Sequence, residues 1–146
     1  PADTGLKSLY VVFSRPARLM PGTVTGVGED VSGIWLAGAG TGIGAPIPTR
    51  IADRLRGKEF SSFDAFRKAF WQAVRDDPAL FNQFNVDAQD RLVSGNAPAV
   101  RDREAVGTRG VFEIHHVERI VDGGAVYDID NLRINTPRNH ISQHKK

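Results

Sequence analysis

The four histidines of the chain lie in its last 32 residues, at positions 115, 116, 140 and 144. His140 and His144 are four residues apart, so on a helix their imidazoles share one face. A third imidazole from a neighbouring strand would complete a metal site with three protein ligands. Such a site leaves one coordination position open, as catalytic metal sites do. The spacing therefore indicates a metal site with three histidine ligands and one open position.

One member of the adjacent pair, His115 or His116, is left over for another task. Successive strand residues point to opposite faces, so both cannot bind the same ion on a regular strand. A neutral imidazole beside a metal-bound phosphate suits a general base, because its ordinary pKa lies close to neutral pH. Glu113 faces the same side of a strand as His115, and we expect it to orient a ligand, an arginine or the base.

The elements that must position these side chains follow from the local pattern. Residues 110–117 alternate in polarity as a strand does, Asp122 and two glycines indicate a turn, and residues 132–134 form a second short strand. Thr136 followed by Pro137 is typical of a helix start, so a helix is expected to close the chain. The predicted order is strand, strand, helix.

Four helices are predicted upstream, over residues 50–56, from Ser62 to about Asp76, from Pro78 with Leu80, Phe81 and Phe84, and over 86–94. In the second of these helices, an apolar stripe predicts core positions at Phe63, Phe66, Phe70 and Val74. The glycine-rich residues 21–44 are expected to form loops, and residues 9–13 a lone strand.

Composition limits the class of protein. The 146 residues are 40% hydrophobic and 25% charged, as in one ordinary folded domain, and no run approaches the ~20 apolar residues of a membrane-spanning helix. We expect an α+β fold, mainly helical, in a single domain with no membrane segment. The absence of cysteine disfavours a closed structural zinc site. A net charge of +2 does not by itself predict nucleic-acid binding. Because the chain begins at Pro1 and has no signal peptide, we expect a piece of a longer protein.

The pattern Glu113, His115 and His116, then Asn131, then His140 and His144 resembles the His-Asn-His (HNH) nuclease motif in its ββα-metal form. Residues 44–48, 51–60, 63–68 and 123–128 are similar to the cytotoxic DNase domain of nuclease bacteriocins, the E-type colicins and S-type pyocins. The resemblance covers residues 18–145. It implies that residues 18–146 are the nuclease domain, and that residues 1–17 are a linker or the end of a preceding translocation domain.

The resemblance also implies a role for each site residue. His115, His140 and His144 would hold one divalent ion, either Mg²⁺ or an ion of the Zn²⁺ and Ni²⁺ class, and His116 would be the general base. Asn131 would fix the loop between the strands and help to orient His116. Two arginines, Arg18 and Arg109, would contact the scissile phosphate, and Glu113 would orient these groups. An arginine suits this task because its planar guanidinium meets phosphate oxygens bidentately.

The implied activity is metal-dependent cleavage of double-stranded DNA with little sequence preference, as the killing domain of a bacteriocin. Such a protein is released from the producing bacterium and acts in the cytoplasm of its target. An acidic immunity protein would bind around residues 82–103, where Ala99 stands in place of an aromatic anchor. We expect Arg101, Arg103 or the helix before them to compensate. Two other functions stay open at this point: a site-specific HNH endonuclease, and a non-catalytic, zinc-stabilised DNA-binding module.

Overall fold

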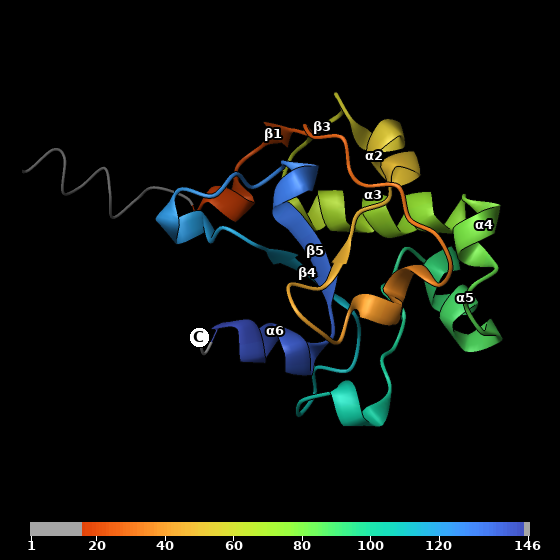
Figure 1. The fold of residues 1–146 in the computed structure, drawn as a ribbon. Helices are drawn as coiled ribbons and strands as arrows, with labels where there is room; N and C mark the ends of the chain where they lie inside the picture. Colours follow the sequence, from red (N-terminus) through yellow and green to blue (C-terminus); the bar gives the residue numbers. More distant parts are fainter. Residues whose placement is uncertain (1–15, 145–146) are drawn as a thin grey trace, which may run out of the picture.

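The structure, a computed structural model, describes residues 16–144 (Figure 1). It combines helices with small antiparallel sheets, which confirms the predicted α+β class. The lone strand predicted at residues 9–13 lies outside the described residues. Between residues 16 and 144, no helix is both long and apolar enough to cross a membrane.

The predicted helices form with small shifts at their ends. They are α2 (Thr49–Leu55), α3 (Phe63–Arg75), α4 (Pro78–Phe81), α5 (Val86–Val93) and α6 (Pro137–His144). The Ser62 hydroxyl accepts a hydrogen bond from the Ala65 amide at 3.3 Å, and the Asp77 carboxylate accepts one from the Leu80 amide at 3.2 Å. These are the caps of α3 and α4 that the sequence predicts.

The third predicted helix is shorter than expected. It ends at Phe81, so Phe84 lies outside it. The reason is a second cap: the Asn85 side chain accepts a hydrogen bond from the Ala88 amide at 2.9 Å and begins α5. Phe84 therefore lies in the turn between two short helices.

The central sheet is antiparallel, with the order β2 (Ala45–Pro46), β5 (Leu132–Asn135) and β4 (Glu113–His116). Glu113 lies opposite Asn135, and His116 opposite Leu132. The predicted strand over 110–117 is thus shortened to its second half. Residues 110–112 pair elsewhere, because the Phe112 amide donates to the Pro98 carbonyl and the Val100 amide to the Gly110 carbonyl, both at 3.0 Å.

A second sheet joins two-residue strands, β1 (Gly22–Thr23) and β3 (Glu59–Phe60), that the sequence does not predict. Most of residues 21–44 is irregular, as expected, apart from β1 and the 3₁₀ turn η2 (Trp35–Gly38). Gly123 has a φ of 93° and follows the short 3₁₀ helix η4 (Ile120–Asp122), which confirms the predicted turn between the two strands.

Helix α3 forms the centre of the core, and the β4–β5 hairpin lies beside it (Figure 1). Its apolar stripe is buried as predicted, at Phe63, Phe66, Phe70 and Val74. Trp35 packs on this stripe, with its ring centroid 6.1 Å from that of Phe70. The core therefore fixes β4 on one side, while α6 packs against β4 and β5 (Figure 1).

Candidate metal centre and active site

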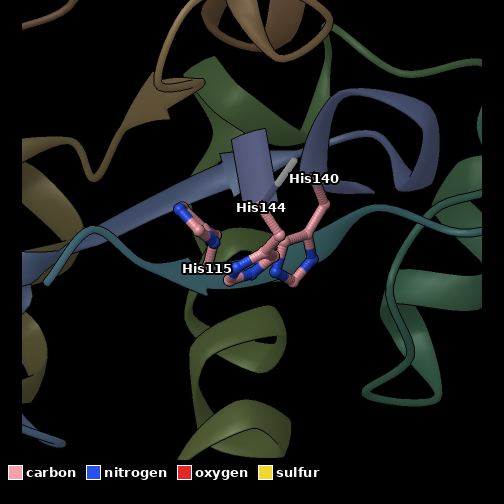
Figure 2. Close-up of side chains that lie close together, drawn as sticks. All are labelled: His115, His140 and His144. Carbon is pink, nitrogen blue, oxygen red and sulfur yellow. The ribbon is translucent and has the colours of Figure 1, made fainter. Parts of the chain in front are cut away.

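Three imidazoles converge where β4 meets α6 (Figure 2). The ring centroids of His115 and His140 are 4.6 Å apart, those of His115 and His144 5.1 Å, and those of His140 and His144 4.8 Å. One ring nitrogen from each residue lies within 4.8 Å of the other two. The strand and the helix thus bring together the three residues that the spacing and the resemblance single out.

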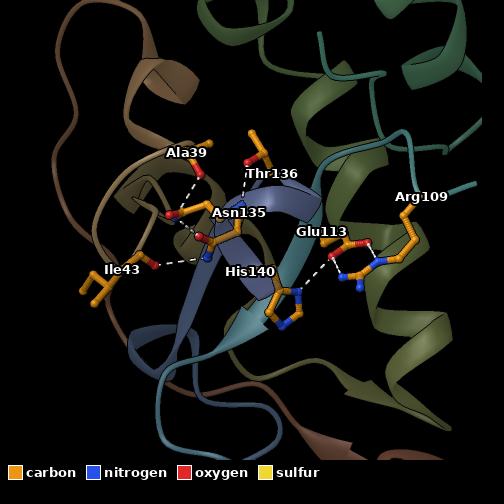
Figure 3. A network of polar contacts seen from close by, with 8 residues as sticks. Ala39, Ile43, Arg109, Glu113, Asn135, Thr136 and His140 are labelled. Carbon is orange, nitrogen blue, oxygen red and sulfur yellow. Dashed lines mark hydrogen bonds and ion pairs between the residues drawn. The ribbon is translucent and has the colours of Figure 1, made fainter. Parts of the chain in front are cut away.

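Helix α6 begins at a fixed place because its first turn is anchored by buried polar groups (Figure 3). The Thr136 hydroxyl accepts from the Asn139 amide at 3.1 Å, the usual N-terminal cap. The Asn139 side chain donates to the Gly42 carbonyl and to the side-chain oxygen of Asn135. Asn135 in turn donates to the Ile43 carbonyl at 3.1 Å. This network ties the helix that carries His140 to the loop over residues 38–44.

Glu113 links one of the clustered histidines to an arginine (Figure 3). Its carboxylate accepts hydrogen bonds from Nε of Arg109 at 2.8 Å and from Nδ1 of His140 at 2.9 Å. Burial raises the pKa of Glu113, but the hydrogen bonds from Arg109 and His140 outweigh burial, and the pKa lies below its usual value. Because an ionised carboxylate only accepts, Nδ1 of His140 carries the proton and Nε2 keeps its lone pair.

The His115 ring is neutral and has a ring nitrogen available to bind a metal ion. Burial, followed by the nearby charges of His140, His144 and His116, lowers its pKa to about 4, so the ring is neutral at neutral pH. Its Nδ1 atom is buried and has no hydrogen-bond partner among residues 16–144. A buried polar atom of this kind normally has a partner. A metal ion bound by the cluster would fit a set of neutral imidazoles with nitrogen lone pairs to offer.

His116 faces the other side of the strand, as alternation predicts. Its ring packs on Phe63 of α3, with centroids 4.8 Å apart, and its Nε2 lies 3.0 Å from the Val126 carbonyl. A carbonyl oxygen can only accept, so Nε2 carries the proton and Nδ1 is the unprotonated nitrogen. Burial lowers the pKa of His116, which keeps the ring neutral. Because His116 is the last residue of β4, its ring still lines the same cleft of about 220 Å³ as His115.

Arg18 also lines that cleft, although it lies almost 100 residues earlier in the chain. Its guanidinium carbon is 5.1 Å from the centre of the Phe63 ring, a cation–π distance. Burial and the charge of Arg67 lower the pKa of Arg18. Arg18 lies within the 3₁₀ turn η1 (Ala17–Leu19). The residue that follows this turn is anchored, because the Tyr127 hydroxyl donates to the Met20 carbonyl at 2.7 Å.

The remaining predicted residues are Arg109 and Asn131. Arg109 faces a neighbouring cleft of about 660 Å³, which Arg18 and His140 also line. Asn131 lies in the loop between the strands. Its side-chain oxygen accepts from the Glu118 amide at 2.8 Å, and its amide donates to the carbonyls of Glu118 and Ala125 at 3.1 and 3.0 Å.

The sequence reasoning missed two contributors to this site. Phe63 is predicted only as a core residue, yet its ring touches Arg18, Arg67 and His116 and holds them together. Arg119 is not predicted at all, but it lines the cleft that holds the histidines. Its position three residues after His116, in the loop that closes the motif, is the one available signal.

An antiparallel hairpin followed by a helix, with three histidines brought together and an asparagine fixing the connecting loop, is the ββα form of an HNH nuclease. A family model described as Colicin/Pyocin-S2, DNase domain, matches residues 22–146, and the chain belongs to that family.

Its relatives include bacteriocins of two bacteria. The chain is 51% identical to pyocin-S2 of Pseudomonas aeruginosa over 145 residues, which is 99% of this chain but 21% of that protein. It is 52% identical to colicin-E8 of Escherichia coli over 125 residues, or 86% of this chain and 61% of that one. The chain thus spans about a fifth of the length of pyocin-S2.

Two solved structures have the same fold. The mutant nuclease domain of pyocin S8, solved with its cognate immunity protein, has a TM-score of 0.82 and 50% identity over 84% of this chain and 98% of that one. The DNase of pyocin AP41, solved as a DNase–immunity complex, has a TM-score of 0.82 and 48% identity over 86% and 98% of the two chains.

Proposed function

We propose that this domain is a metal-dependent endonuclease that hydrolyses phosphodiester bonds of double-stranded DNA with little sequence preference. The observation that carries the proposal is the convergence of three ring nitrogens within 4.8 Å beside His116 and Arg18 in one cleft. Membership of a DNase family supports the choice of DNA as substrate.

In this proposal His115, His140 and His144 hold one divalent ion. Three imidazoles favour Zn²⁺, Ni²⁺ or Co²⁺ on affinity, and Mg²⁺ is the alternative for phosphate chemistry. Such an ion, held by these three residues, would stabilise the charge on the phosphoryl oxygens and on the leaving 3′ oxygen. Glu113 does not bind the ion itself in this proposal. It accepts a hydrogen bond from Nδ1 of His140, which leaves Nε2 of that ring available for the ion.

His116 takes the proton from the attacking water. Its Nδ1 is the unprotonated nitrogen, since Nε2 donates to the Val126 carbonyl. The lowered pKa keeps the ring able to accept a proton at neutral pH. Arg18 and Arg109 approach the cluster from the larger cleft and bind the scissile phosphate, while Asn131 holds the loop that carries Val126 and so orients His116.

The test is cleavage of supercoiled plasmid by metal-stripped protein, with Mg²⁺, Zn²⁺, Ni²⁺ or Co²⁺ then restored and EDTA as the control. The proposal predicts conversion to nicked and linear DNA and then to a smear, only when metal is present. Discrete bands would instead support a site-specific endonuclease. No cleavage with any of these ions would support the zinc-stabilised binding module.

We further propose that an acidic immunity protein neutralises the domain by binding around residues 82–103. The two similar nucleases of known structure were solved with immunity proteins, which supports such a partner. Helix α5 in this segment exposes Val86 and Val93, whose side chains are 71% and 57% exposed, and Arg101 and Arg103 are also exposed. Replacing Val86 and Val93 by Ser should leave plasmid cleavage unchanged and weaken inhibition by the cognate immunity protein. Unchanged inhibition would place the interface elsewhere.

The whole protein that carries this domain is, in this proposal, a bacteriocin that leaves the producing cell and delivers the nuclease to the cytoplasm of a target bacterium. The domain boundary near residue 18 belongs to the same proposal. Expression of the domain inside Escherichia coli without an immunity protein should be lethal, and expression of a His116→Ala variant should be tolerated. Equal toxicity of the two would contradict killing by DNA cleavage.

A further inference from the structure

Arg119 lies where two clefts meet beside the histidine cluster. It lines the cleft of about 220 Å³ together with His115, His116 and His144. It also lines a smaller cleft of about 160 Å³, formed with Ile43, Val117 and Gln143, which Arg18 does not line. The side chain is exposed, and its guanidinium makes no hydrogen bond or ion pair with the residues between 16 and 144.

The other arginines around the cluster have protein partners. Arg109 is paired with Glu113, and Arg67 with Asp64. Arg18 stacks on the Phe63 ring. Of the two arginines that line the cleft of about 220 Å³, Arg119 is therefore the one that has neither a carboxylate nor a ring, within the described residues, to hold its charge.

The backbone that carries Arg119 is nevertheless held firmly. Its carbonyl accepts from the amides of Asp122 and Gly124, both at 2.9 Å. Glu118, the preceding residue, is held on both sides by the Asn131 side chain, at 2.8 and 3.1 Å. The loop closes so tightly that a Cβ atom on Gly124 would lie 1.9 Å from the Glu118 carbonyl oxygen, so only glycine fits there.

This combination of a fixed backbone and an unpaired guanidinium is what a phosphate-binding arginine requires. A fixed stem lowers the entropy lost on binding, and a planar guanidinium grips phosphate oxygens bidentately. A carboxylate partner would compete with the phosphate, and Arg119 has none among the described residues. Glu118 is the adjacent charged residue, and its side chain is exposed to solvent.

We infer that Arg119 binds a DNA phosphate next to the scissile one, where the histidine cluster opens into the cleft of about 160 Å³. The inference rests on the proposed function, because it takes the DNA strand to pass through the cleft that holds His116. With Arg18 and Arg119 both lining that cleft and each in contact with a phosphate, the strand is held at the cluster. Such contacts fix position and carry no base information, which agrees with cleavage of little sequence preference.

The test uses Arg119→Gln and Arg119→Lys in the full domain. Binding of a 20-base-pair duplex is measured in EDTA at several salt concentrations. Plasmid cleavage and Zn²⁺ affinity are measured on the same protein preparations without EDTA. Arg119→Gln should bind DNA severalfold more weakly and make the slope of log K against log salt shallower by about 0.9, the effect of one lost phosphate contact. Arg119→Lys should restore most of that slope, and Zn²⁺ affinity should stay at the wild-type value.

Arg54→Gln is the matched control, since Arg54 is an exposed arginine on α2 that lines none of the clefts described above. It should keep the wild-type slope and cleavage. A wild-type slope in Arg119→Gln would overturn the inference and leave the proposed function standing if the wild-type domain cleaves plasmid. Loss of Zn²⁺ affinity in that variant would also overturn it, because Arg119 would then support the site and not the DNA. A wild-type domain that neither binds nor cleaves DNA would overturn both.

Discussion

Glu113 on β4 and His140 on α6 share a hydrogen bond of 2.9 Å between a carboxylate oxygen and Nδ1. The same carboxylate also holds Arg109. Of the three tasks that the sequence leaves open for Glu113, the structure brings it to a clustered histidine and to an arginine, and not to His116. One side chain thus sets the tautomer of a candidate ligand and the position of a cation.

Glu113→Gln tests that connection. The amide keeps the shape but loses the charge, so the hydrogen bonds to His140 and Arg109 weaken. Metal affinity should fall about 10- to 100-fold, the usual effect of losing such an outer partner. Titration with Zn²⁺ checks this, with Glu118→Gln as the matched control on an exposed carboxylate. Equal affinity of wild type and Glu113→Gln would show that the hydrogen bond does not support the ligand.

Asn139→Ala tests whether the buried amides position α6. The substitution leaves the carbonyl of Gly42 and the side chain of Asn135 without their donor, which should cost about 1–3 kcal/mol of unfolding free energy. Because Asn139 precedes His140, metal affinity should also fall.

The control for that loss is Asp77→Ala, which removes another buried polar group, the partner of Arg50 and the cap of α4. It should lower stability by a similar amount and leave Zn²⁺ affinity unchanged. Urea unfolding and the Co²⁺ absorption spectrum report the two effects separately. If both variants keep the wild-type spectrum and affinity, the amide network only stabilises the fold.

The metal-free domain should lose stability as the pH falls from about 6.5 towards 4. Burial is the largest cause that lowers the pKa values of His115, His116 and His140 in the folded state, that of His115 to about 4. Within this window the unfolded chain therefore binds more protons than the folded one, and acid favours unfolding. Urea unfolding in EDTA at pH 7.5, 6.5, 5.5 and 4.5 measures the slope. His115→Gln should flatten it, and a wild-type stability that is flat between pH 7.5 and 5 would contradict the assigned burial.

Local signals account for what the sequence predicts well. The caps at Ser62 and Asp77, the stripe of α3 and the Thr136–Pro137 helix start each act within a few residues, so they can be found without knowing the fold. The spacing of His140 and His144 belongs to the same class, because one helical turn sets it.

Long-range contacts account for what the sequence does not predict. Two-residue strands such as β1 and β3 carry no periodicity, and β4 is shortened because residues 110–112 pair with residues 98–100. Arg18 is assigned to the site by the family resemblance and not by a local pattern. Its guanidinium lies on the Phe63 ring, and the Tyr127 hydroxyl anchors the nearby Met20 carbonyl, so three separate parts of the chain meet here. No pattern within a short window encodes such a meeting.

The central claim is that three histidines hold the metal while His116 acts as the base. Metal content and plasmid cleavage, measured on the same samples of wild type, His116→Ala and His140→Ala, test it most directly. The account predicts one ion per chain in His116→Ala with cleavage lowered by about 10² or more, the usual effect of a lost general base. It predicts weakened metal binding together with lost cleavage in His140→Ala. Wild-type metal binding in His140→Ala, or wild-type cleavage in His116→Ala, would contradict the assignment.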